Sequence, residues 1–190
     1  MAGEGIVVAF AGAIGSGKSN LSRHVAGLLG CPRVSFGDYI RGIAEANHMD
    51  SSDRGVLQRL GQALVVSNAE DFARKVLATR PDWQPGQNLV IDGLRHVEVR
   101  QVLFTLVRPS ILKLVFLSID ETSRRQRAQR DKEIPQPQLI RYDQDITEAQ
   151  IPRILPSYAD VVVDSTLPVD IAAREVLSRL GLQVPMVAAE

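Results

Sequence analysis

The sequence predicts a three-layer α/β domain with a five-stranded parallel sheet and helices on both faces. Two patterns support this. Short, largely continuous apolar runs are typical of strands that are buried on both faces of a parallel sheet. Helical segments separate these runs, and such crossovers return the chain to the same edge of the sheet. The expected strands are residues 6–11, 33–36, 88–92, 111–117 and 161–164.

The boundaries of the helices follow from residues that start or stop a helix. Gly30 and Pro32 end the first helix, because glycine leaves the helical conformation easily and proline cannot continue it. The pair Gly37-Asp38 is expected to turn the chain into the second helix, and the polar residues 51–53 offer N-caps for the third. Residues 81–86, 108–110 and 134–137 are expected to be irregular. The expected helices are residues 18–29, 39–47, 54–80, 96–107, 121–132, 147–155 and 169–180.

Composition narrows the classes of function. The chain has 190 residues and a formal net charge of +0, with 45% apolar and 23% charged residues. These values are typical of one globular domain, and without a global basic field we expect no nucleic-acid partner. The apolar runs are too short to span a membrane and no secretory signal is recognisable, so we expect a cytoplasmic protein without a membrane partner. We expect it to be a monomer or a homodimer. Cys31 is the only cysteine and is expected to be a small core or edge residue rather than a nucleophile.

A phosphate-binding loop (Walker A) follows the first expected strand. Residues 12–19 fit the pattern G-x-x-x-x-G-K-[ST] and run directly into an expected helix. Glycines let backbone N–H groups turn toward phosphate oxygens, and the helix adds the positive end of its dipole. We expect Lys18 to reach the outer phosphates of ATP and the Ser19 hydroxyl to hold Mg²⁺. The residues expected to bind the nucleotide are Gly12, Ala13, Ile14, Gly15, Ser16, Gly17, Lys18, Ser19 and Asn20.

Two arginines and two aspartates follow the second and third strands. Ligands of parallel α/β sheets bind outside the carboxyl ends of the strands, where Arg41 and Arg95 are expected beside the phosphate loop. Guanidinium groups hold phosphate through two parallel hydrogen bonds, so this pair predicts a second anion site. Asp92 ends a strand of the Walker B kind and is expected to hold Mg²⁺ through water. Asp38 is expected at the same substrate site.

These segments resemble motifs of the adenylate kinase-like nucleoside monophosphate kinases. Residues 35–41, S-F-G-D-Y-I-R, look like the family's S-T-G-D-x-[LI]-R segment. Residues 92–95, D-G-L-R, are similar to its D-G-F-P-R segment, shortened by one residue and without the proline. The resemblance covers residues 6 to 95 and implies a P-loop NTPase fold in which Arg41 and Arg95 grip the phosphate of the acceptor. It also implies that the helical segment of about residues 38–80 covers the acceptor.

An arginine-rich segment of about residues 120–145 resembles the lid of these kinases. Arg124, Arg125, Arg127 and Arg130 lie on one short expected helix, and Arg141 follows it. Such a helix is also found as a solvated basic face. The resemblance implies that Arg124 and Arg127 are catalytic, closing over the transferring phosphoryl group, and that residues 159–165 form the last strand and the loop beside the adenine.

The sequence is compatible with three functions. The first is ATP- and Mg²⁺-dependent phosphoryl transfer to a nucleoside or deoxynucleoside monophosphate. The second is a kinase for a hydroxyl acceptor, of the dephospho-coenzyme A kinase kind, with Asp38 as the base. The third is a regulatory P-loop ATPase. The two acceptor-side arginines favour a phosphate acceptor and therefore the first function, and a regulatory ATPase would leave them without a role.

Overall fold

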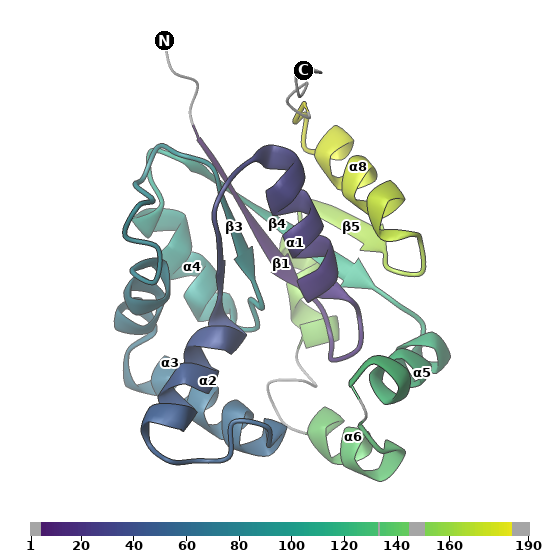
Figure 1. Cartoon of the computed structure of the whole chain (residues 1–190). Helices are drawn as coiled ribbons and strands as arrows, with labels where there is room; N and C mark the ends of the chain where they lie inside the picture. Colours follow the sequence, from purple (N-terminus) through teal and green to yellow (C-terminus); the bar gives the residue numbers. More distant parts are fainter. Residues whose placement is uncertain (1–4, 133, 145–150, 184–190) are drawn as a thin grey trace, which may run out of the picture.

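The computed structural model describes residues 5–132, 134–144 and 151–183 (Figure 1). The strands are β1 (Ile6–Ala11), β2 (Arg33–Ser35), β3 (Leu89–Asp92), β4 (Ile111–Ser118) and β5 (Val161–Asp164). The α-helices are α1 (Lys18–Leu29), α2 (Phe36–Ala46), α3 (Arg54–Leu77), α4 (Val97–Leu106), α5 (Glu121–Lys132), α6 (Gln136–Asp143) and α8 (Val169–Arg179). A 3₁₀ helix, η1 (Leu155–Tyr158), precedes β5.

The five strands form one sheet in the order β2-β3-β1-β4-β5, and every pair of neighbours is parallel. This confirms the predicted fold class. All six residues of β1 are buried, because the central strand is covered on both faces. Val7 and Ala9 face one side, whereas Val8 and Phe10 face the other, as the period of two in a strand requires.

Two apolar cores sandwich the sheet. The first lies between the sheet and helices α3 and α4, with Phe36 of α2 at its edge, and the second lies between the sheet and helices α1 and α8. Figure 1 shows α1 and α8 together on one side of the strands and α4 on the other. Because α1 follows β1 and α4 follows β3, the loops after these adjacent strands diverge to opposite faces. A crevice therefore opens at the carboxyl ends of β1 and β3, as in other doubly wound sheets.

The predicted start of the second helix was wrong. The structure ends β2 at Ser35 and begins α2 at Phe36, so Gly37 and Asp38 lie in the first helical turn. The Ser35 hydroxyl is the reason, because it accepts a hydrogen bond from the backbone N–H of Asp38 at 3.1 Å and caps the helix. This cap places Arg41 one turn into the helix, as the sequence predicted.

Two further helices differ from the predictions. Helix α3 ends at Leu77 and is interrupted at Asn68, whose φ of −166° and ψ of 98° are not helical. The Asn68 side chain accepts a hydrogen bond from the Asp71 N–H at 2.9 Å and so caps the second half of α3. The segment expected to be irregular at residues 134–137 instead contributes the first turn of α6, where proline is tolerated.

The expected helix at residues 147–155 lies partly outside the described residues. Residues 151–154 are helical and continue directly into η1. Helices α5 and α6 lie together beyond the carboxyl ends of the strands, where the lid was predicted (Figure 1). No helix in the described part of the chain has the length and apolar character needed to cross a membrane.

Candidate functional site

The loop between β1 and α1 has the backbone conformation of a phosphate cradle. Gly15 and Gly17 have φ angles of 85° and 82°, in the left-handed region that favours glycine. A Cβ atom on Gly15 would lie 2.7 Å from the carbonyl oxygen of Arg124, so the position also lacks room for a side chain. The loop then runs into α1 at Lys18, where the positive end of the helix dipole adds to the cradle.

Lys18 and Arg124 each donate a hydrogen bond to a backbone carbonyl of this loop. Lys18 is buried, and its Nζ donates a hydrogen bond to the carbonyl of Ala13 at 3.3 Å. Arg124 is only 6% exposed and donates to the carbonyl of Ile14 at 3.2 Å. The same guanidinium holds Asp143 of α6 at 2.6 Å and Glu121 at 2.9 Å. Burial alone would lower the pKa of Arg124, but its hydrogen bonds to Asp143 and Glu121 raise that pKa above its ordinary value.

Asp92 lies beside the phosphate loop, at the end of β3, in register with Phe10 of β1. Its side chain is almost completely buried. Arg33 donates to one carboxylate oxygen, Oδ2, at 2.5 Å. The other, Oδ1, is buried and has no hydrogen-bond partner among the described residues. A buried carboxylate oxygen without a partner is costly unless a group that binds in function satisfies it.

The residues at this point fit a magnesium ion. Mg²⁺ prefers oxygen ligands and keeps several of its own waters, and a metal-bound water would satisfy Oδ1 of Asp92. Ser19 lies in the first turn of α1, where its hydroxyl is available as a direct ligand. Since Arg33 already neutralises Asp92, contact through water suits this carboxylate better than direct coordination. The bound ion would neutralise charge on the outer phosphates of a nucleotide.

A cavity adjoins the phosphate loop between α2, α3 and the segment after β3. Ile14 belongs to its wall, so the cavity adjoins the phosphate loop directly. Most of the wall is apolar, and three arginines supply its positive charge. Two of them, Arg41 and Arg95, were predicted to meet here, and the structure brings them to the same cavity. The residues around this arginine cavity are Ile14, Phe36, Gly37, Ile40, Arg41, Arg54, Leu57, Gln58, Gly61, Phe72, Gly93, Leu94, Arg95, His96 and Val99.

The third arginine, Arg54, was not identified from the sequence. Burial lowers its pKa, and the charge of Arg41 lowers it further. Among the described residues, no carboxylate lies within 4.0 Å of the Arg54 guanidinium, and the ion pair of Arg41 is with Asp38. Two like charges brought together in a half-buried cavity repel each other. An anion bound between them would relieve this repulsion.

Asp38 was predicted at the substrate site, but its side chain does not line the arginine cavity. Its carboxylate is held instead by Arg41 at 2.6 Å and faces Arg33 at 3.6 Å. Asp38 borders an open groove on another side of α2, with a volume of about 550 Å³. Asp38 therefore contacts Arg41 without itself lining the cavity.

The two predicted lid arginines occupy different environments. Arg124 is buried and donates to the phosphate loop, as described above. Arg127 lies one helical turn further along α5 and donates a hydrogen bond to the carbonyl of Ser165 at 2.6 Å. It borders a cavity of about 290 Å³ between the phosphate loop and the start of α8. This is the place expected for the adenine of a bound nucleotide, beside the loop after β5. The other residues of its wall include Ser16, Gly17, Asn20, Leu21, Leu117, Arg130, Ser165 and Leu167.

Cys31 behaves as the sequence predicted. Burial raises the pKa of its thiol to about 11, and the sulfur has no disulfide partner. A thiol with so high a pKa is almost completely protonated at neutral pH and is a weak nucleophile. Cys31 instead packs at the edge of the core beside α1.

Comparison with known proteins identifies the family to which this chain belongs. The family model described as AAA domain matches residues 8–151, from β1 to the segment that precedes η1. The chain belongs to the AAA domain family. A UPF0200 protein of Aeropyrum pernix is 35% identical over 98 residues, which cover 52% of this chain and 51% of that protein. This chain thus matches about half the length of that curated relative.

Solved structures of small-molecule kinases share the fold of this AAA domain protein. A gluconokinase from Sinorhizobium meliloti 1021 aligns with a TM-score of 0.54 at 20% identity, covering 94% of this chain and 92% of that one. A shikimate kinase from Acinetobacter baumannii, in complex with shikimate, aligns with a TM-score of 0.59 at 16% identity, covering 93% and 94%. The shikimate kinase of Aquifex aeolicus gives a TM-score of 0.59, also at 16% identity, covering 93% and 96%. At these identities the comparison establishes a P-loop kinase fold.

Proposed function

We propose that this protein transfers the γ-phosphoryl group of ATP to a nucleoside or deoxynucleoside monophosphate, giving the diphosphate. The observation that carries the proposal is the arginine cavity, where Arg41, Arg54 and Arg95 converge next to the phosphate loop. Three guanidinium groups fit an acceptor that brings its own negative charge. The resemblance of residues 35–41 and 92–95 to monophosphate kinases agrees with this acceptor.

The chemistry requires positioning and charge rather than a base. An oxygen of the acceptor phosphate attacks the γ-phosphorus of ATP, a new P–O bond forms, and the bond to the bridging oxygen of ADP breaks. The acceptor oxygen is already ionised, so no proton has to be removed. The phosphate loop and Lys18 hold the donor, the arginine cavity holds the acceptor, and Ile14 belongs to both sites. Such an arrangement supplies the alignment and electrostatic stabilisation on which phosphoryl transfer depends.

A hydroxyl-acceptor kinase is the second candidate, because the gluconokinase and shikimate kinases that share the fold are named for such acceptors. That chemistry needs a carboxylate close to the hydroxyl group. Asp38 is the residue the sequence offers, yet Arg33 and Arg41 engage its carboxylate, which lies outside the arginine cavity. A regulatory ATPase would leave the convergence of three arginines without a role.

The direct test is a panel of acceptors assayed with ATP and Mg²⁺. The panel contains the ribose and deoxyribose monophosphates of each base, dephospho-coenzyme A, gluconate and shikimate. We expect ADP release that depends on one or more monophosphates, together with the corresponding diphosphate by chromatography. Phosphorylation of a hydroxyl acceptor alone, or ATP hydrolysis that no acceptor stimulates, would overturn the proposal.

Replacing Lys18 by Ala should reduce transfer by at least about a hundredfold, because its charge stabilises the transferring phosphoryl group. The lysine contributes its charge at the phosphate loop rather than apolar packing in either core, so the fold should remain. Steady-state turnover and the melting temperature measure the two effects. Arg23→Ala, at an exposed position further along α1, is the matched control. Near-normal turnover of the Lys18 variant would contradict the role of the loop.

Replacing Arg41, Arg54 or Arg95 by Ala should impair use of the acceptor and spare ATP. Loss of one bidentate, charge-assisted contact should cost about 2–4 kcal/mol, or about thirtyfold to a thousandfold in kcat/KM for the acceptor. Affinity for ATP should change by less than about threefold, since the arginines line a different cavity. Lys should not restore activity at these positions, because an ammonium group lacks the planar fork of a guanidinium.

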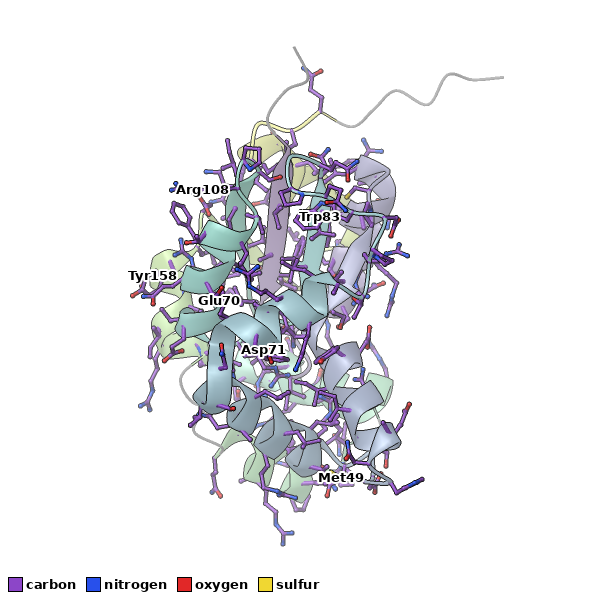
Figure 2. The ribbon with its side chains drawn as sticks, turned by 90° about the vertical axis from the view of Figure 1, so that its left-hand side faces the viewer. Met49, Glu70, Asp71, Trp83, Arg108 and Tyr158 are labelled. Carbon is purple, nitrogen blue, oxygen red and sulfur yellow. The ribbon has the colours of Figure 1, made fainter. Side chains whose placement is uncertain are left out.

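The control for these three variants is Arg108→Ala. Arg108 follows α4 at the end remote from Arg95, and Figure 2 shows it far from Met49, which follows α2. It should behave as the parent protein does. Equal losses of ATP affinity and acceptor use, or no loss of either, would mean that the cavity is not a separate anion site.

Asp38→Asn separates the two kinase functions. If the acceptor is a phosphate, loss of this carboxylate disturbs only the support of Arg41, and kcat should fall by less than about tenfold. If Asp38 is the base for a hydroxyl group, kcat should fall by about a hundredfold or more. Asp82→Asn, at an exposed loop position, controls for the loss of one negative charge. A collapse of kcat in a folded Asp38 variant would favour the hydroxyl acceptor.

A further inference from the structure

Arg33, the first residue of β2, joins three parts of the site that are remote in sequence. Its Nε donates to the Ser22 hydroxyl of α1 at 3.0 Å. One terminal nitrogen donates to Oδ2 of Asp92 at the end of β3, and the other lies 3.6 Å from Oδ2 of Asp38 in α2. The side chain is 17% exposed, so these contacts are largely shielded from water.

Each of these contacts leads on to a residue of the proposed chemistry. Ser22 donates to the carbonyl of Ser19, the proposed magnesium ligand, at 3.1 Å. Oδ1 of Asp92 would contact the metal through a bound water. The other carboxylate oxygen of Asp38 accepts from Arg41, which lines the arginine cavity, at 2.6 Å. The Arg33 guanidinium thus connects the residues proposed to hold Mg²⁺ with the residue that supports Arg41 in the arginine cavity.

Arg33 acts on the acceptor only through other residues, because it does not line the arginine cavity. It borders the open groove on another side of α2, together with Asp38 and Arg80. Without the positive charge of Arg33, the negative charges of Asp92 and Asp38 would be less well balanced. Both carboxylates would then repel the phosphates of the bound nucleotide and acceptor more strongly. Asp92 would be the more costly of the two, since its side chain is almost fully buried.

We propose that Arg33 is a positioning residue that couples the metal-side carboxylate of Asp92 to the acceptor arginine Arg41 through Asp38. The guanidinium donates a hydrogen bond to Asp92 and lies within ion-pair distance of Asp38, which in turn fixes the direction of Arg41. The proposal deepens the proposed function and rests on its acceptor site.

The test is a calorimetric titration of inorganic phosphate into the whole protein. The phosphate loop is first filled with the non-hydrolysable analogue adenylyl imidodiphosphate and Mg²⁺, so that added phosphate reports on the arginine cavity. The affinity of Arg33→Gln for phosphate should fall about tenfold, the loss typical when a group that orients a binding residue is removed. Arg33→Lys should lose about threefold, since a lysine keeps the charge but cannot hold both carboxylates. Arg80→Gln is the matched control, because Arg80 is exposed, borders the same groove and makes no ion pair with the described residues.

A double-mutant cycle tests the route through Asp38. In an Asp38→Asn background the Arg33→Gln substitution should cost less than about threefold in phosphate affinity, because the relay is already broken. Asp38 is well exposed, so its variant is expected to fold. Melting temperatures of all variants report any general loss of stability. Arg33→Lys keeps the test available if Arg33→Gln unfolds.

The outcomes separate this proposal from the proposed function. If Arg95→Ala weakens phosphate binding but Arg33→Gln lowers only the melting temperature, then Arg33 is structural and the inference fails alone. An equal cost of Arg33→Gln with and without Asp38 would also overturn it. If the parent protein does not bind phosphate, or Arg95→Ala binds it as tightly as the parent, the anion site fails and both proposals fall.

Discussion

Burial of the parallel sheet on both faces is the constraint on which the rest of this structure depends. The central strand β1 has no exposed residue, so it carries no functional side chain along its length. Polar groups can reach a ligand only where the strands end. The chain uses that edge repeatedly, with the phosphate loop after β1, Arg41 after β2 and Arg95 after β3. Nearest neighbours in the site are therefore far apart in the sequence.

Some charged groups at this edge of the sheet have a partner of opposite charge, and others do not among the described residues. Around Asp92 the charges are matched, because Arg33 pairs with the carboxylate inside a nearly dry environment. Around Arg54 they are not matched among the described residues, and its pKa is lowered by burial and by Arg41. A protein that keeps cations together without a counter-charge loses stability, and it regains that stability when an anion binds. The contrast between these two regions supports the proposed anion site beside Arg54.

Helices α5 and α6, which the sequence predicted to form a lid, are attached to the same edge by contacts of their own. Arg124 of α5 holds Asp143 of α6 and the carbonyl of Ile14, so one side chain attaches both helices to the phosphate loop. Gln58 of α3 donates to the carbonyl of Tyr142 at 3.2 Å and attaches α6 to the helix that covers the arginine cavity. The arginine-rich helix therefore contains a structural arginine, Arg124, as well as Arg127 at the expected adenine site.

Much of this architecture follows from local patterns. Apolar runs and the helices between them determine the strands, and the spacing of Gly15, Gly17 and Lys18 determines the phosphate loop, because only glycine accepts those backbone angles easily. Arg41 and Arg95 could be predicted since each follows a strand within a recognisable segment. The exact start of α2 could not, because the cap at Ser35 competes with the turn suggested by Gly37 and Asp38.

Short-range patterns in the sequence encode the parallel sheet, the phosphate loop and two of the three cavity arginines. The surroundings of Arg54, Arg33 and Asp38 depend on contacts that form only when the chain folds. Arg54 is the first residue of α3, and no motif in the sequence around it predicts that it lines a cavity. Arg33 looks like an ordinary charged residue on an edge strand until β3 brings Asp92 to its guanidinium. Ion pairs between segments tens of residues apart leave no spacing in the sequence, since the fold alone sets the distance between their charges.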